Sequence, residues 1–101
     1  MPVLKVGPCS SLPPGSMVEV IEGETRIAVC NVNGEYHAVD GVCPHRGGPL
    51  AQGALHENMI VCPWHAWEFD CRTGEHDFNS ALKLPKYTVK MEGDELFVEV
   101  P

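Results

Sequence analysis

The sequence carries, in its middle third, Cys43-Pro44-His45-Arg46-Gly47-Gly48-Pro49-Leu50 and then Cys62-Pro63-Trp64-His65-Ala66-Trp67. Each stretch offers one thiol and one imidazole, spaced Cys-x-His in the first and Cys-x-x-His in the second. Sixteen residues separate His45 from Cys62. This content is typical of a metal centre with sulfur and nitrogen ligands, and the rest of the chain is interpreted around it.

The ligand types narrow the choice of metal. Two soft thiolates and two imidazoles suit zinc or an iron–sulfur cluster, whereas hard cations take oxygen ligands. Structural zinc usually takes its ligands in Cys-x2–4-Cys and His-x3–5-His pairs, but here each stretch mixes the two types. The mixture suits two irons, one ligated by both thiolates and the other by both imidazoles. Gly47 and Gly48 would let backbone amides approach bridging sulfides. The spacing therefore favours an iron–sulfur cluster over zinc.

Alternation of apolar residues predicts strands on both sides of these stretches. Hairpins are expected at Glu22-Gly23-Glu24, Asn33-Gly34 and Glu92-Gly93-Asp94, between strands at residues 17–21, 26–32, 35–39, 87–91 and 95–100. The apolar run at residues 59–61 suits a central strand. Nine prolines and ten glycines argue against long helices. The sequence predicts an all-β domain of short antiparallel strands, a small barrel or sandwich.

The remaining residues form two segments rich in Gly, Pro and His, at about 41–53 and 62–85, which are predicted to be the functional loops. No internal repeat, low-complexity tract or linker divides the chain. A single domain over residues 1–101 is expected.

Size and charge exclude several classes of protein. A chain of 101 residues and 11.0 kDa is too short for a two-domain enzyme. Its 14 acidic and 7 basic residues give a formal charge of -7, which repels phosphate and argues against nucleic-acid binding.

Five cysteines are an odd number, so a disulfide framework would leave one thiol over. We see no secretory signal in the first residues, and no apolar run approaches the roughly 20 residues of a membrane helix. We therefore expect a cytoplasmic protein, in which clustered Cys and His indicate metal rather than disulfides.

The pattern Cys43-x-His45-x16-Cys62-x-x-His65 resembles the Rieske [2Fe–2S] motif. The similarity extends to Asp70-x-x-Thr73-Gly74 and to Pro85-Lys86-Tyr87, so it covers essentially the whole chain. It implies a Rieske-type domain, a small antiparallel β-barrel or sandwich with a cluster-binding loop subdomain. It also implies that Cys43 and Cys62 bind the inner iron and that His45 and His65 bind the outer one. A third loop, at about residues 81–85, is expected to cover the cluster.

The branch of the family is indicated by what the motif lacks. High-potential Rieske proteins join an extra Cys from each ligand loop in a disulfide, and Gly48 and Trp64 occupy those positions here. They also place a Ser and a Tyr after the second His, where this chain has Trp67 and Phe69. Hydrogen bonds to cluster sulfur raise the potential, so their loss implies a value near the low end of the Rieske range, about -150 mV.

The function implied by the resemblance is that of a ferredoxin, a soluble one-electron carrier. It would take electrons from an NAD(P)H-dependent flavin reductase and pass them to a terminal oxygenase of the aromatic-ring-hydroxylating type. We expect no enzyme activity, because no nucleophile–base arrangement is visible and about 36 residues after His65 leave no room for a mononuclear iron domain.

Two alternatives remain open at this level. The first is the small subunit of an assimilatory NAD(P)H nitrite reductase, which resembles the same fold. The second is a zinc-stabilised interaction module.

Several residues outside the motif are interpreted conservatively. Cys9, Cys30 and Cys71 are expected to be bystander thiols, and His37, His56 and His76 to be surface or structural residues. Trp64 and Trp67 are expected to shield the cluster, with Trp64 a candidate for docking, as is Arg46.

Overall fold

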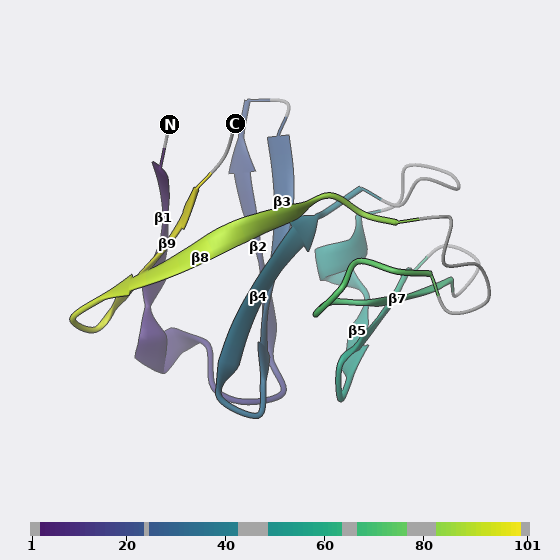
Figure 1. The fold of residues 1–101 in the computed structure, drawn as a ribbon, viewed down its shortest axis with the longest axis horizontal. Helices are drawn as coiled ribbons and strands as arrows, with labels where there is room; N and C mark the ends of the chain where they lie inside the picture. The colour runs from purple at the N-terminus through teal and green to yellow at the C-terminus, as the bar shows by residue number, and fades with distance from the viewer. Residues whose placement is uncertain (1–2, 24, 43–48, 64–66, 77–82, 100–101) are drawn as a thin grey trace.

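The computed structural model describes residues 3–23, 25–42, 49–63, 67–76 and 83–99. These residues form two antiparallel sheets (Figure 1). The larger sheet has the strand order β1-β9-β8-β4-β3-β2. Its strands are β1 (Val3–Pro8), β2 (Met17–Glu22), β3 (Thr25–Val32), β4 (Glu35–Asp40), β8 (Lys86–Glu92) and β9 (Glu95–Glu99). Its two edge strands, β1 and β2, approach each other, so the sheet curves toward a barrel. The predicted all-β architecture of short antiparallel strands is confirmed.

The smaller sheet has the order β5-β6-β7 and lies beside the barrel (Figure 1). Its strands are β5 (Ala54–His56), β6 (Met59–Val61) and β7 (Glu68–Asp70). Two 3-10 turns, η1 (Cys9–Ser11) and η2 (Leu50–Gln52), complete the elements of the described residues.

The three predicted hairpins form where the turn residues place them. The registers Glu22↔Thr25, Val32↔Glu35 and Glu92↔Glu95 each leave a two-residue turn. In the second turn Asn33 and Gly34 have φ of 54° and 93°, the left-handed pair that matches the twist of the flanking strands.

Strands β1, β5 and β7 were not predicted from the sequence. Strand β7 even lies inside the segment 62–85 that was predicted to be loop. With three residues each, β5 and β7 are too short to show a period, and they form because both pair with β6.

Strand β3 separates two parts of the core. Ile27 and Val29 pack with Leu96 and Val98 inside the barrel, whereas Ala28 and Cys30 pack against the smaller sheet. Because both faces are covered, the strand is an almost continuous apolar run. Among its polar side chains, that of Asn31 is buried. Its Nδ2 donates to the Leu12 carbonyl at 2.8 Å, and its Oδ1 accepts from the Gly34 N–H at 2.8 Å.

Candidate metal centre

Cys62, one of the four predicted ligands, follows β6 directly and is 1% exposed. Its backbone N–H donates to the carbonyl of Trp67 at 2.7 Å. We call the stretch from Cys62 to Trp67 the second ligand loop. This bond joins its two ends, just beyond the β6–β7 pairing. A buried thiolate is costly unless a cation compensates it, so this position fits a metal-bound sulfur.

The first ligand loop, which runs between Val42 and Pro49, is also closed by backbone pairing at its two ends, which we call its base. Val42 and Pro49 form an antiparallel bridge, the Leu50 N–H donates to the Gly41 carbonyl at 2.9 Å, and Gly41 donates to Arg26 on β3 at 2.8 Å. The other predicted ligands, Cys43, His45 and His65, lie outside the described residues, as do Arg46, Gly48 and Trp64.

The bases of the two ligand loops lie against each other. A Cβ added at Gly53, which follows η2, would overlap the carbonyl oxygen of Val61 and lie 3.1 Å from Cδ of Pro63. Leu50 and Cys62 also belong to the same core cluster. The chain just after the first ligand loop therefore lies against the start of the second ligand loop.

The predicted third loop is described only at its end. Leu84 is buried, and its N–H donates to the Gly74 carbonyl at 2.7 Å. The backbones of Lys83 and Glu75 pair in an isolated antiparallel β-bridge. The Pro85 carbonyl then accepts from the N–H of Asp40 at 2.9 Å, which ties this segment to β4. Ala81 and Leu82 lie outside the described residues.

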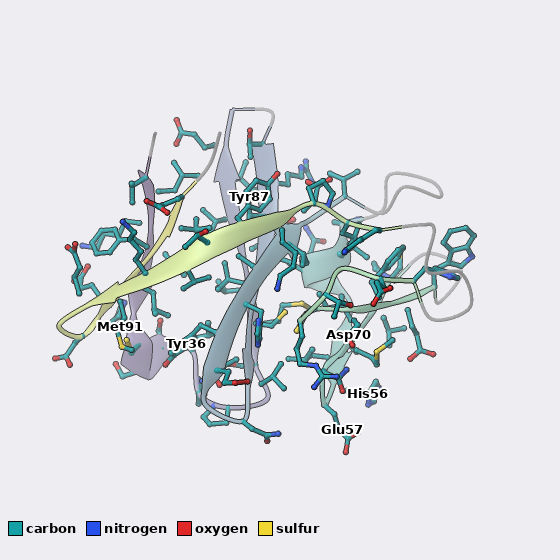
Figure 2. The ribbon with its side chains drawn as sticks, viewed as in Figure 1. Tyr36, His56, Glu57, Asp70, Tyr87 and Met91 are labelled. Carbon is teal, nitrogen blue, oxygen red and sulfur yellow. The ribbon has the colours of Figure 1, made fainter. Side chains whose placement is uncertain are left out.

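Three aromatic rings support the second loop. The His76 ring meets Trp67 edge-on with centroids 4.6 Å apart and meets Phe69 in the same way at 5.2 Å. Phe69 is fully buried and pairs with Ile60 on β6. The sequence predicted a surface or structural residue at His76 but did not indicate these ring contacts, because contacts across a turn leave no periodic signal. His56 lies at the opposite end of β6, at the tip of the β5–β6 hairpin (Figure 2).

Charged groups gather where β7 ends, on the side facing β4. Arg72 donates to both carboxylate oxygens of Asp70, at 3.4 and 3.3 Å, and Lys86 donates to the Arg72 carbonyl. Burial opposes ionisation of Asp70, but the Arg72 side chain and backbone N–H outweigh it and lower its pKa. His37 on β4 has a lowered pKa, because burial and then Lys86 disfavour its charged form.

Among the described residues, no three His, Cys, Asp or Glu side chains gather to hold a metal ion. None of the four described cysteines is in a disulfide. Of the four predicted ligands, the described residues contain Cys62, together with the bases of both ligand loops.

Comparison with known proteins gives the family. The model of the Rieske [2Fe-2S] domain matches residues 3–96. The chain belongs to this family, and its cofactor is the Rieske-type [2Fe–2S] cluster. Both the predicted relationship and the predicted cofactor are confirmed.

Individual relatives are similar over most of the chain. The chain is 34% identical over 101 residues to the ferredoxin component of biphenyl 2,3-dioxygenase of Rhodococcus jostii (strain RHA1), covering 99% of this chain and 94% of that one. It is 39% identical over 85 residues to human Apoptosis-inducing factor 3, covering 83% of this chain but only 14% of that protein.

Solved structures agree with the fold. A chain from the complex of reduced oxygenase and oxidised ferredoxin in carbazole 1,9a-dioxygenase matches with a TM-score of 0.86 and 29% identity, over 95% of this chain and 91% of that chain. A putative NADH-dependent nitrite reductase small subunit from Mycobacterium tuberculosis matches with a TM-score of 0.85 over 99% of this chain and 96% of that chain. Its 20% identity shows a shared fold only. No helix among the described residues has the length and apolar character to cross a membrane.

Proposed function

We propose that this protein is a ferredoxin of the Rieske type, which carries single electrons and has no enzyme activity of its own. One observation carries the proposal: the similarity to the ferredoxin component of biphenyl 2,3-dioxygenase spans nearly the full length of both chains. The match relates nearly all residues of this chain to a ferredoxin component.

The proposed ligands are Cys43 and Cys62 for one iron and His45 and His65 for the other. The soft thiolates and imidazoles are the donors that a Rieske cluster requires. The burial of Cys62 and the adjacency of the two loop bases support this assignment. When bound, the cluster supplies a site that gains and loses one electron.

The protein's own contribution is to hold the ligand loops in place. The Cys62–Trp67 and Leu50–Gly41 backbone bonds fix the loop ends, and the buried core below them contains no charged side chain among the described residues. Fixed ligands and a dry core keep the surroundings of the cluster similar in both charge states, which favours rapid electron transfer.

We propose a low reduction potential, near about -150 mV. Gly48 and Trp64 replace the cysteines of the high-potential branch, and Phe69 has no hydroxyl to donate to sulfur. Phe69 is fully buried and packs against the rings of Trp67 and His76. We therefore expect no water molecule beside Phe69 to take the place of the missing hydroxyl.

The proposed partners are a flavin-dependent NAD(P)H reductase and a terminal oxygenase, in the cytoplasm. The similarity to a chain of an oxygenase–ferredoxin complex supports the second partner. The formal charge of -7 favours transient encounters with basic partner surfaces. A nitrite reductase small subunit is the weaker alternative, since the likeness to such a subunit is limited to the fold.

The first experiment establishes the cofactor and its ligands. Protein purified without oxygen is expected to contain about two irons and two acid-labile sulfides per chain and to give a rhombic EPR signal after reduction. His65→Ala and Cys62→Ala are expected to lose the cluster, whereas the matched variants His56→Ala and Cys9→Ala keep it. If the purified protein contained zinc but neither iron nor acid-labile sulfide, the proposal would be wrong and the zinc-stabilised interaction module would be favoured.

The second experiment tests electron transfer itself. The reduced protein is mixed in a stopped-flow instrument with the oxidised terminal oxygenase of a biphenyl dioxygenase system, and the oxidised protein with its NADH-reduced reductase. Single-electron exchange in both mixtures is expected, with rates that fall as salt rises. Stable co-purification with a nitrite reductase large subunit, and no exchange with the oxygenase, would favour the alternative.

A further inference from the structure

Cys30 and Cys71, predicted to be bystander thiols, form a pair between the two sheets. Cys30 lies on the face of β3 that packs against the smaller sheet, and Cys71 follows β7. Both are 0% exposed and belong to the same core cluster, and their side chains share a hydrogen bond.

This pair is separate from the proposed cluster ligands. Cys62 sits at the end of the β6–β7 hairpin that Trp67 closes, whereas the Cys71 N–H donates to the Asn58 carbonyl at the other end, at 2.8 Å. Cys71 comes four positions after Trp67, which at the rise of a strand is about 13 Å. The pair is thus one hairpin length away from the second ligand loop.

The two thiols differ in acidity. The hydrogen bond from Cys30 lowers the pKa of Cys71, burial and Asp70 oppose it, and the positive charges of Arg72 and Lys86 support it. The same hydrogen bond, together with burial, strongly raises the pKa of Cys30. The positive charges of Arg72 and Lys86 lie beside Cys71 and favour its thiolate, so Cys71 takes the role of the attacking sulfur.

We propose that Cys30 and Cys71 are a second redox site, a thiol pair that hydrogen peroxide oxidises to a disulfide joining the barrel to the smaller sheet. The inference goes beyond the proposed function, because it does not require the cluster to carry electrons. A small uncharged oxidant suits the site, since neither sulfur is accessible to a large thiol reagent without local opening.

The reaction balances with peroxide as the oxidant. Cys71 releases its proton, its thiolate attacks one peroxide oxygen, and the O–O bond breaks, so that Cys71 becomes a sulfenic acid. The leaving hydroxide takes up the proton that Cys71 released and forms the first water. The Cys30 sulfur then attacks Cys71, an S–S bond forms, and the S–O bond breaks. The leaving oxygen takes the Cys30 proton and departs as water. Two thiols lose two electrons, and one peroxide becomes two waters.

The consequence of the disulfide is mechanical. It would link residues 30 and 71, which are far apart in sequence, across the interface that carries the ligand loops. A cross-link over so long a loop reduces the freedom of the unfolded chain, and it fixes the smaller sheet on β3.

Peptide mapping of the cluster-loaded protein tests the proposal. After titration with hydrogen peroxide, free thiols are alkylated in denaturant, and the chain is cut after glutamate. This cleavage separates all four relevant cysteines, giving fragments 25–35 with Cys30, 36–57 with Cys43, 58–68 with Cys62 and 69–75 with Cys71. We expect fragments 25–35 and 69–75 to become linked, and dithiothreitol to release them.

The variants sharpen the result. Cys71→Ala and Cys30→Ala are expected to abolish the linked fragment, and Cys9→Ala to leave it unchanged. The linked form is also expected to unfold at a higher denaturant concentration than the reduced form, and Cys71→Ala removes this difference.

Two outcomes would overturn the inference. One is that Cys30 and Cys71 stay fully alkylatable at peroxide levels that already oxidise Cys9. The other is that fragments 36–57 and 58–68 become linked first, which would mean that oxidation begins at the cluster ligands. The EPR signal of the same samples reports cluster integrity, so failure here is distinguishable from failure of the proposed function.

Discussion

Gly74 shows how much a single position contributes to the covering of the site. Its φ is 84°, and a Cβ at this position would overlap the carbonyl oxygen of Leu84. The turn after β7 thereby approaches the segment that ends the third loop. The sequence indicated Gly74 through its resemblance to a family motif. The structure shows why glycine is needed there, because the backbone of Gly74 lies directly against the backbone of Leu84.

Gly74→Ala is expected to destabilise the protein by about 3 kcal/mol, because steric overlap adds to left-handed strain. Gly93→Ala is the matched control. It has a φ of 59° with no atom within 4 Å of the added Cβ, so strain alone costs about 1 kcal/mol. Urea unfolding midpoints measure both. Equal losses in the two variants would show that the Leu84 contact is not close.

At the scale of elements, the smaller sheet is stabilised by strand pairings that no pattern in its own sequence predicts. Strands β5 and β7 have three residues each and exist through their pairing with β6. The long strands and tight hairpins of the barrel were predictable, because turn residues and alternation act locally. The short strands were not, because only their neighbours stabilise them.

His76 is expected to stabilise the second ligand loop through its edge-on contacts with Trp67 and Phe69. His76→Ala is expected to lose about 1–2 kcal/mol, the value of two aromatic pairs, and to release the cluster faster. His76→Phe keeps the ring and is expected to restore most of both. Unfolding midpoints and the decay of visible absorbance provide the measurements. If Phe behaved like Ala, the contact would depend on the imidazole nitrogens rather than the ring.

At the scale of the whole molecule, the imidazole of His37 is a titratable group on which charges from several strands act. His37 lies opposite Cys30 in the β3–β4 register. Its Nε2 is buried without a hydrogen-bond partner, 3.9 Å from a Glu35 oxygen. Lys86 from β8 and Arg72 after β7 lower its pKa further than burial alone, while Glu35 and Asp70 oppose them.

This environment makes stability depend on pH. Since the folded pKa of His37 is lowered, the unfolded chain binds a proton first as pH falls below its ordinary value, about 6.5. Stability is therefore present above that pH and decreases below it, by at most about 1.4 kcal/mol per pH unit. We expect the free energy of unfolding of His37→Gln, measured by urea denaturation, to change less between pH 7.5 and pH 6.0 than that of the wild type. Equal differences in the two proteins would assign the pH dependence to other groups.

The sequence by itself determined the family, its cofactor and the hairpins of the barrel, because motif spacing and turn chemistry can be recognised along the chain. It also predicts the four cluster ligands. The tertiary structure decided the rest. It showed that β3 is buried on both faces, that the Gly53 turn meets the base of the second ligand loop, and that Cys30 meets Cys71. These contacts join residues far apart in the chain. No local pattern encodes them, because they arise only when two sheets share one core.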